Sequence, residues 1–363
     1  MIIIAAQPPL VNLSGLPVIF RVSSNMFDEP YFRIKAVPVA GQAEFKQLNS
    51  NDEAVFDLRE FFAAELRSEL KTSPSVHPDA AKEFEPTFYE YYGVPPTTHA
   101  SAMETIVVVR GSIPRWYLSQ FYQNYDDFND YIATEKHLTL WPRTQPKRVL
   151  PGQPELIYFL APSSATYSPS VLINYADGTT ASHSPAISVS AQALQVASLP
   201  VGFSVLNIAG VNPSKQVTSY TVTIAGVSRT YTVDHTPYRE VRYLIFRNSL
   251  GGYDTLACTG EADESTRATR QIAEAVYDPD HLVRNNKRVY AIEHNEVVKV
   301  NSGWLLPAER DWLNELLISD DVYEQIGNII RPVMMISAEL DRSRRRFNPG
   351  SVEIEYERLC PAV

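Results

Sequence analysis

The residues Val171-Leu172-Ile173-Asn174-Tyr175, followed by Asp177-Gly178 and then Thr179 to His183, decide the class of fold. The first run alternates in the manner of a half-buried strand, and Asp-Gly is a strong signal for a tight hairpin turn. The same pattern returns between Tyr220 and Val233, around a turn at Ala225-Gly226. Short strands at this spacing predict an Ig-like β-sandwich over residues 151–237.

Upstream of this sandwich, residues 1–150 predict an N-terminal β-rich domain. Strand-like alternation covers residues 17–22 and 31–37. A helix is expected over 57–70, because Leu58, Phe61, Phe62 and Leu66 form one apolar stripe and Asp57 can cap its amino end with Glu60. A proline-rich run, residues 142–154, predicts a stiff connector into the sandwich.

Residues 71–99 are rich in proline, threonine, serine and glutamate, which predicts a long surface loop. Tyr89, Tyr91 and Tyr92 form an aromatic cluster in it, and Trp116 follows after the buried strand expected at 105–110. The cluster is either a contact surface or a means of pinning the loop to its own domain. The sequence leaves both readings open.

Downstream, residues 238–363 predict a C-terminal α+β domain, and the sequence leaves open whether it packs with the N-terminal domain. Two hairpins are expected, one turning at 248–252 and one turning at 293–296. Pro307 predicts the start of a helix, and Ser319 predicts a second helix with Asp320 and Asp321 in its first turn. Buried strands are expected at 333–336 and 351–357.

Composition narrows the class of protein. The chain has 363 residues, 44% of them hydrophobic, which excludes a wholly disordered protein. Its net charge of -10 disfavours a protein that coats nucleic acid. Proline (26) exceeds glycine (15) and tyrosine (20) exceeds phenylalanine (15), a balance that favours many strands and half-exposed aromatic surface. The apolar start lacks a basic leader, and no apolar run is long enough to predict a membrane span.

The sequence offers no pattern typical of catalysis or cofactor binding. It has no nucleophile elbow and no glycine-rich nucleotide loop, so no catalytic residue, metal or cofactor is predicted. Cys258 and Cys360 are far apart in the sequence and are read as buried free thiols. Glu293, His294 and Glu296 cluster on an expected turn, which is weak evidence for metal.

Paired carboxylates are the residues that glycoside hydrolysis requires. Asp126 with Asp127 and Glu353 with Glu355 are the candidates, although a helix cap and a solvated strand face explain them more simply. The most basic run contains Arg342, Arg344, Arg345 and Arg346. We interpret it as a subunit contact or a source of cross-strand ion pairs rather than a nucleic-acid site.

Several stretches carry a resemblance to a known class of proteins. They are Phe56–Phe62, Tyr243–Thr255, Ser302–Leu305, Trp312–Leu317 with Val322-Tyr323, and Pro332-Val333. In these stretches the chain resembles tail and baseplate structural proteins of bacteriophages that infect Bacteroidota. The resemblance covers the first 70 and last 125 residues, approximately, and brings no catalytic residues with it. It implies a virion subunit that assembles into a ring or spike and contacts other tail proteins.

The resulting expectation is a mainly β, multidomain virion protein, assembled in the host cytoplasm, which binds copies of itself and other tail proteins. It is expected to be non-enzymatic. The alternative is a carbohydrate-binding or host-surface adhesion module in which Tyr91, Tyr92 and Trp116 stack on a glycan. A glycoside hydrolase is the third hypothesis.

Overall fold

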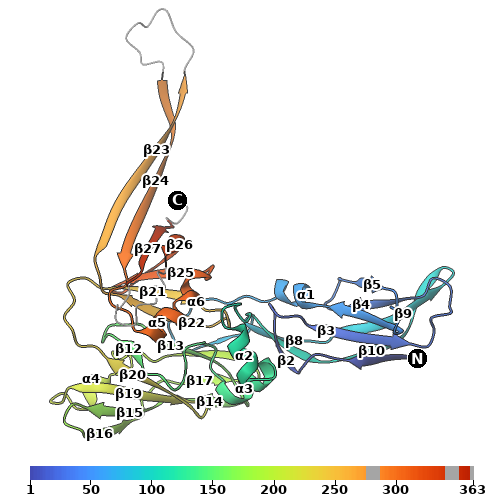
Figure 1. Ribbon diagram of the computed structural model, residues 1–363, viewed down its shortest axis with the longest axis horizontal. Coiled ribbons are helices and arrows are strands. Elements are labelled where there is room, and N and C mark those ends of the chain that lie inside the picture. The colour runs from blue at the N-terminus through green and yellow to red at the C-terminus, as the bar shows by residue number, and fades with distance from the viewer. Residues whose placement is uncertain (275–286, 340–350, 360–363) are drawn as a thin grey trace, which may run out of the picture. The chain divides into compact units, whose positions relative to one another are not determined.

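The structure is a computed structural model and describes residues 1–274, 287–339 and 351–359. The chain divides into two compact units: unit 1 comprises Met1–His235 with Asn248–Asp254, and unit 2 comprises Thr236–Arg247 with Thr255–Val363. Strands predominate and the helices are short (Figure 1), which confirms the prediction of a mainly β chain. The boundary expected near residue 150 falls inside unit 1.

The amino-terminal part of unit 1 contains three small sheets. Their strands, in spatial order, are β1 (Ile2–Ala6), β3 (Ile19–Ser24) and β6 (Glu53–Asp57); β10 (Pro96–Met103), β9 (Thr87–Gly93), β4 (Arg33–Val37) and β5 (Glu44–Lys46); and β2 (Val11–Leu13), β11 (Ile106–Val109) and β8 (Ala81–Phe84). Phe88 lies in their shared core, with ring centroids 5.2 Å from Phe20 and 5.6 Å from Phe56. All three rings are fully buried, as period-two alternation predicts for the inner face of a sheet.

The prediction of a long loop over 71–99 is wrong. Four strands occupy this segment: β7 (Ser75–His77), β8, β9 and the start of β10. The prolines stand between strands or at the first residue of one, as Pro86 and Pro96 show. Proline cannot donate to a sheet ladder, but at these places no ladder hydrogen bond is lost.

The helix expected over 57–70 is present only as α1 (Arg59–Ala64). Its apolar stripe does face the core, because Leu58, Phe62 and Leu66 are buried. Asp57 is not the capping residue; its Oδ1 instead accepts hydrogen bonds from the backbone N–H groups of Val18 and Arg59. The apolar stripe is therefore buried by a helix that is shorter than the periodicity of the stripe predicts.

The rest of unit 1 is built around the predicted sandwich. One sheet contains β12 (Lys147–Val149), β20 (Val227–Val233), β19 (Val217–Ile224), β15 (Ser170–Tyr175) and β16 (Thr180–His183); the others contain β13 (Leu156–Leu160), β18 (Val196–Pro200) and β7, and β14 (Ala165–Tyr167) with β17 (Val189–Ala191). Both predicted hairpins are confirmed. Ala225 and Gly226 both have positive φ, the conformation that a tight hairpin turn needs.

The expected connector over 142–154 is part of the sandwich, because β12 pairs in parallel with β20. β7 pairs with β18, which joins the segment before residue 80 to the same layer. Short helices complete unit 1: α2 (Leu118–Asn124), α3 (Phe128–Glu135) and α4 (Ile208–Val211). Residues that the sequence divides between two domains therefore share sheets within one unit.

Unit 2 is organised around one seven-stranded sheet. Its strands, in spatial order, are β22 (Tyr253–Cys258), β21 (Arg242–Arg247), β25 (Val322–Ile326), β26 (Ile329–Glu339), β27 (Glu353–Arg358), β24 (Lys287–Asn301) and β23 (Ala262–Glu274). Two short helices, α5 (Pro307–Trp312) and α6 (Asn314–Leu317), precede β25. As predicted, Pro307 begins α5, and Val352, Ile354 and Tyr356 are buried on one face of the last strand.

Three predictions for unit 2 are wrong. No turn occurs at 293–296; β24 continues through these residues in register with β23, as the pairing of Glu296 with Thr266 shows. No helix begins at Ser319, whose hydroxyl makes a local turn with Asp321 that leads into β25. The strand at 333–336 is present in β26, but Met334 and Ile336 are about half exposed.

Candidate functional site

The predicted tyrosine cluster lies on β9, where its rings contact residues of the same part of unit 1. Tyr91 packs edge-on against Phe45 at 5.2 Å, and Tyr92 stacks on the ring of His99 at 3.9 Å. The amine of Lys35 lies 5.8 Å from the centre of the Tyr89 ring. All three tyrosines are half-buried. These contacts favour the pinning interpretation over that of a free aromatic surface.

The other predicted interaction residues do not join this cluster. Trp116 is half-buried before α2; its ring lies 5.5 Å from that of Tyr117, and it has no ring contact with the three tyrosines. Its indole N–H is buried without a hydrogen-bond partner among the described residues. Arg342, Arg344, Arg345 and Arg346 lie outside the described residues.

Two of the four candidate carboxylates, Asp127 and Glu355, have contacts that explain them structurally. Asp127 caps α3 by accepting a hydrogen bond from the Asp130 N–H at 2.9 Å, as the simpler reading of Asp126-Asp127 predicts. On β27, Glu353 is exposed and Glu355 lies 3.9 Å from the amine of Lys299. Glu293 and His294 lie within β24 rather than on a turn. Within the described ranges, no three His, Cys, Asp or Glu side chains are close enough together to hold a metal ion.

Cys258 is buried, and burial raises the pKa of its thiol to about 12. A thiol with such a pKa is protonated at neutral pH and is therefore a poor nucleophile. Cys360 lies outside the described residues. No helix in the described part of the chain is both long and apolar enough to cross a membrane.

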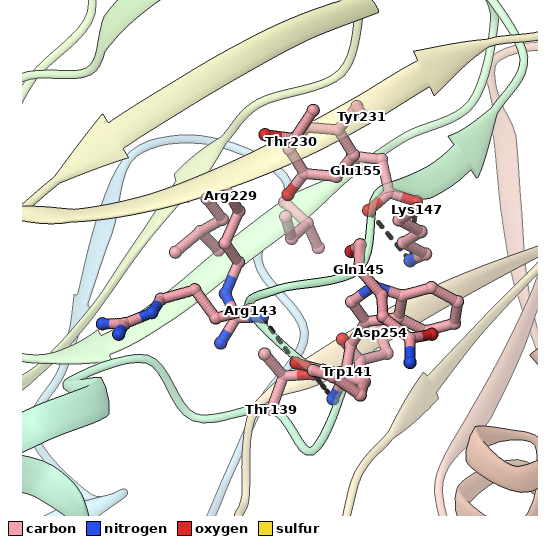
Figure 2. A pocket seen from close by; sticks show the side chains of 13 residues that line it. Thr139, Trp141, Arg143, Gln145, Lys147, Glu155, Arg229, Thr230, Tyr231 and Asp254 are labelled. Carbon is pink, nitrogen blue, oxygen red and sulfur yellow. Dashed lines mark hydrogen bonds and ion pairs between the residues drawn. The ribbon is translucent and has the colours of Figure 1, made fainter. Parts of the chain in front are cut away.

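Unit 1 contains a pocket with about 350 Å³ of empty space near β12, β13 and β20 (Figure 2). Charged and polar side chains line much of it. Lys147, Arg229, Thr230 and Tyr231 come from strands of the sandwich, and the others come from segments between strands or from β22. The labelled lining residues are Thr139, Trp141, Arg143, Gln145, Lys147, Glu155, Arg229, Thr230, Tyr231 and Asp254.

The buried charged groups of this pocket have partners within unit 1. The Lys147 amine lies 2.9 Å from the Glu155 carboxylate, and both side chains are almost fully buried. Arg229 donates to the Trp141 carbonyl at 2.7 Å, and Asp254 accepts from the Thr139 hydroxyl at 2.9 Å. A buried charge without a partner is costly, and these contacts remove that cost. These contacts hold neighbouring segments of unit 1 together, and the lining residue Arg143 is exposed.

A different feature distinguishes unit 2. Strands β23 and β24 form a long hairpin arm that continues past the end of β27 (Figure 1). Within β24, only Glu296–Asn301 pair with β27. Beyond that point Arg267–Glu274 and Lys287–Asn295 pair only with each other, and we call these residues the distal arm. Among the described residues, no third strand supports this ribbon.

The distal arm exposes apolar side chains to solvent. Ile272 lies directly opposite Val289, and their side chains are 55% and 48% exposed. Tyr290 is the extra residue at a β-bulge beside this pair and is 67% exposed. A bulge re-aims neighbouring side chains, and an exposed aromatic of this kind is typical of an interaction surface. The arm is the best candidate functional site in the described chain.

Ion pairs of two buried arginines with the buried Glu324 and with more exposed carboxylates anchor the base of the arm. Arg358 on β27 contacts Glu324 on β25 at 2.8 Å, Glu296 on β24 at 3.1 Å and Glu264 on β23 at 2.7 Å. Arg242 on β21 contacts Glu324 and Glu264, each at 2.8 Å. The Tyr356 hydroxyl also donates to Glu324. We call these six residues the arm-base network.

The network favours the ionised forms of Glu324 and Glu264. Burial opposes ionisation of Glu324, but hydrogen bonds from Arg358, Tyr356 and Arg242 outweigh it and hold its pKa below the ordinary value. Hydrogen bonds from Arg358 and Arg242 also lower the pKa of Glu264. Charge-assisted hydrogen bonds have restricted geometry, so the network fixes the register of five strands at the root of the arm.

Sequence patterns alone did not single out the arm residues Ile272, Val289 and Tyr290. A signal was present, because Glu261–Ser302 contains no glycine and has Pro279 as its single proline. Such a stretch permits two long strands, whereas a hairpin turning at 293–296 has neither glycine nor proline at its turn. The sequence was compared with models of protein families and with curated proteins. It matches no family model and no curated protein.

Proposed function

We propose that the protein is a structural subunit of a bacteriophage tail or baseplate, assembled in the host cytoplasm into a homo-oligomeric ring or spike. The hairpin arm of unit 2 is the single observation that supports assembly most strongly. The phage tail is proposed from the resemblance of stretches such as Tyr243–Thr255 and Trp312–Leu317 to tail and baseplate proteins.

An isolated two-stranded ribbon has little stability in water, and its outer edges offer unpaired backbone groups to another chain. The distal arm adds exposed Ile272, Val289 and Tyr290 to these edges. Burial of such side chains against a partner is favourable by about 25 cal/mol for each Å² of apolar surface removed from water. An anchored arm that exposes apolar side chains is therefore suited to joining neighbouring subunits.

The arm-base network supports the same function. A projecting arm transmits position between subunits only if its root is fixed, and Arg358 joins three strands there. Because the network is complete within one chain, the arm does not depend on a partner for its direction. Preorganisation of this kind reduces the entropy lost on association. The adhesion alternative has no comparable support, since Tyr91 and Tyr92 already pack on Phe45 and His99.

The first test measures copy number and assembly. The protein is expected in purified phage tails in several copies per particle, by quantitative mass spectrometry. Purified full-length protein is expected to form an oligomer whose mass, from light scattering, falls on dilution. A chain that is monomeric at every concentration and absent from tail particles would contradict the proposal.

A second test uses the arm itself. Changing Ile272 and Val289 together to serine is expected to abolish the oligomer while the fold persists, because both side chains are half exposed. The matched control changes Leu172 and Val205, apolar residues 44% and 53% exposed in unit 1, to serine. The control is expected to assemble normally. Equal assembly of the two variants would exclude the arm as an assembly element.

A further inference from the structure

A groove in the amino-terminal part of unit 1 has the features expected of a binding site for an apolar, basic segment. It holds about 730 Å³ of empty space where β4 ends and β9 begins. Its lining residues are Val37, Pro38, Val39, Ala40, Glu83, Phe84, Glu85 and Thr87, which we call the acidic groove.

The acidic groove combines an apolar lining with two carboxylates. Val37 and Val39 are half-buried and Ala40 is exposed, so part of the apolar lining is accessible, and Glu83 and Glu85 are exposed as well. Neither carboxylate forms an ion pair with a described residue, and the neighbouring Lys82 is already paired with Asp79 at 2.9 Å. The groove therefore offers apolar surface with two negative charges on one side. Such a surface attracts a positively charged apolar segment.

The distal arm has the complementary chemistry. Arg270 is exposed and forms no ion pair with a described residue. It stands two residues before Ile272 on β23, so both side chains project from the same face of the ribbon. Val289 lies across from Ile272, and Tyr290 follows at the bulge. One face of the arm thus presents a positive charge beside exposed apolar side chains.

We propose that the acidic groove of one copy receives the distal arm of a second copy, with Ile272 and Val289 against the apolar lining and Arg270 beside Glu83 and Glu85. This inference rests on the proposed function, because it names the partner surface of the same arm. Groove and arm are different surfaces, so the contact is head-to-tail. Head-to-tail contacts build rings when the rotation between subunits closes.

Charge reversal in the full-length protein tests this contact. The groove variant carries Glu83→Arg and Glu85→Arg, and the arm variant carries Arg270→Glu. Each reversal places like charges together, and we expect each to weaken assembly at least about tenfold by light scattering across a dilution series. The variant that combines all three changes is expected to restore assembly, because the charges are then opposite again.

Mixing supplies the evidence that the contact joins two copies. In a mixture of the two variants, the positively charged groove of the groove variant can bind the negatively charged arm of the arm variant. The unchanged groove of the arm variant can likewise bind the unchanged arm of the groove variant. The mixture is therefore expected to assemble although neither variant does so alone. Control variants with the same changes in net charge are Glu60→Arg with Glu69→Arg for the groove and Arg331→Glu for the arm, all at exposed positions. These controls are expected to assemble like the unaltered protein.

The outcomes separate this inference from the proposed function. If the arm variant loses assembly and the groove variant does not, the acceptor surface is wrong and the assembly role stands. If both lose assembly and neither the combined variant nor the mixture regains it, the pairing of these charges is overturned. An unaltered protein that is monomeric and absent from tails overturns both. Circular dichroism spectra matching the unaltered protein show that each variant is folded.

Discussion

The two hairpins β9–β10 and β23–β24 differ in how far they expose their aromatic side chains. β9 carries three tyrosines, but it pairs with β4 as well as β10, and its rings are half-buried against their own unit. The distal arm has no third strand among the described residues, and Tyr290 is 67% exposed. The difference lies in what covers each hairpin. A strand with neighbours on both edges can support its side chains, whereas a free ribbon leaves them available.

The largest effect is expected where β9 contributes to the core. Phe88→Ala removes a fully buried ring that contacts Phe20 and Phe56, and it should destabilise this part of unit 1 by about 4 kcal/mol. Hydrogen exchange followed by mass spectrometry measures the effect on peptides of β3, β6 and β9. The control Phe45→Ala removes a ring that is 43% exposed and should cost less than about 1 kcal/mol. Similar losses for both variants would show that β9 is not supported by its core.

The second effect concerns the root of the arm. Arg358→Met leaves the Glu324 carboxylate, which is 1% exposed, without its principal partner and should cost unit 2 about 3 kcal/mol. Faster hydrogen exchange is expected in β23, β24 and β27, with no change in β9. Arg247→Met is the matched control, because its partner Asp320 is 69% exposed and such pairs contribute about 1 kcal/mol or less. Unchanged exchange in β24 of the Arg358 variant would show that the network does not anchor the arm.

Acid is expected to act on the arm base by the same mechanism, with a smaller effect. The folded-state pKa values of Glu264 and Glu324 lie below the ordinary 4.5, so their ionised forms stabilise unit 2 above about that pH. This stability is lost progressively as the pH falls through the lowered values. Hydrogen exchange in β23 and β24, corrected for its intrinsic pH dependence, should accelerate below pH 4.5 in the unaltered protein. In the variant Glu324→Gln this acceleration should be reduced.

Sequence patterns predicted correctly those parts of the fold that depend on residues close together in the sequence. The Asp177-Gly178 and Ala225-Gly226 turns and the alternation ending at Tyr356 all gave correct elements. Partners distant in the sequence were not predictable in this way. Ser75–His77 is a strand because Val196–Ser198 lies beside it, and Glu293–Asn295 extends because Arg267–Thr269 continues the ladder.

The candidate site shows the same limit. Tyr89, Tyr91 and Tyr92 were conspicuous in the sequence, but the strands and rings beside them determine their exposure. Arg358 looked like an ordinary end of a charged strand, although it joins carboxylates from three other strands. Residue types identified which side chains are able to form contacts. Pairing over long sequence distances determined which of them are free to do so.

The smallest change in stability provides the most direct comparison of the two hairpins. Tyr92→Ser removes a ring stacked on His99 and should cost about 1 kcal/mol, with assembly unaffected. Tyr290→Ser removes a ring that is 67% exposed and should cost less than about 0.5 kcal/mol, yet it should weaken the oligomer. Thermal unfolding and light scattering on the same samples measure both quantities. If Tyr92→Ser weakens assembly and Tyr290→Ser does not, the contact surface lies on β9, and the free ribbon is not the element that joins subunits.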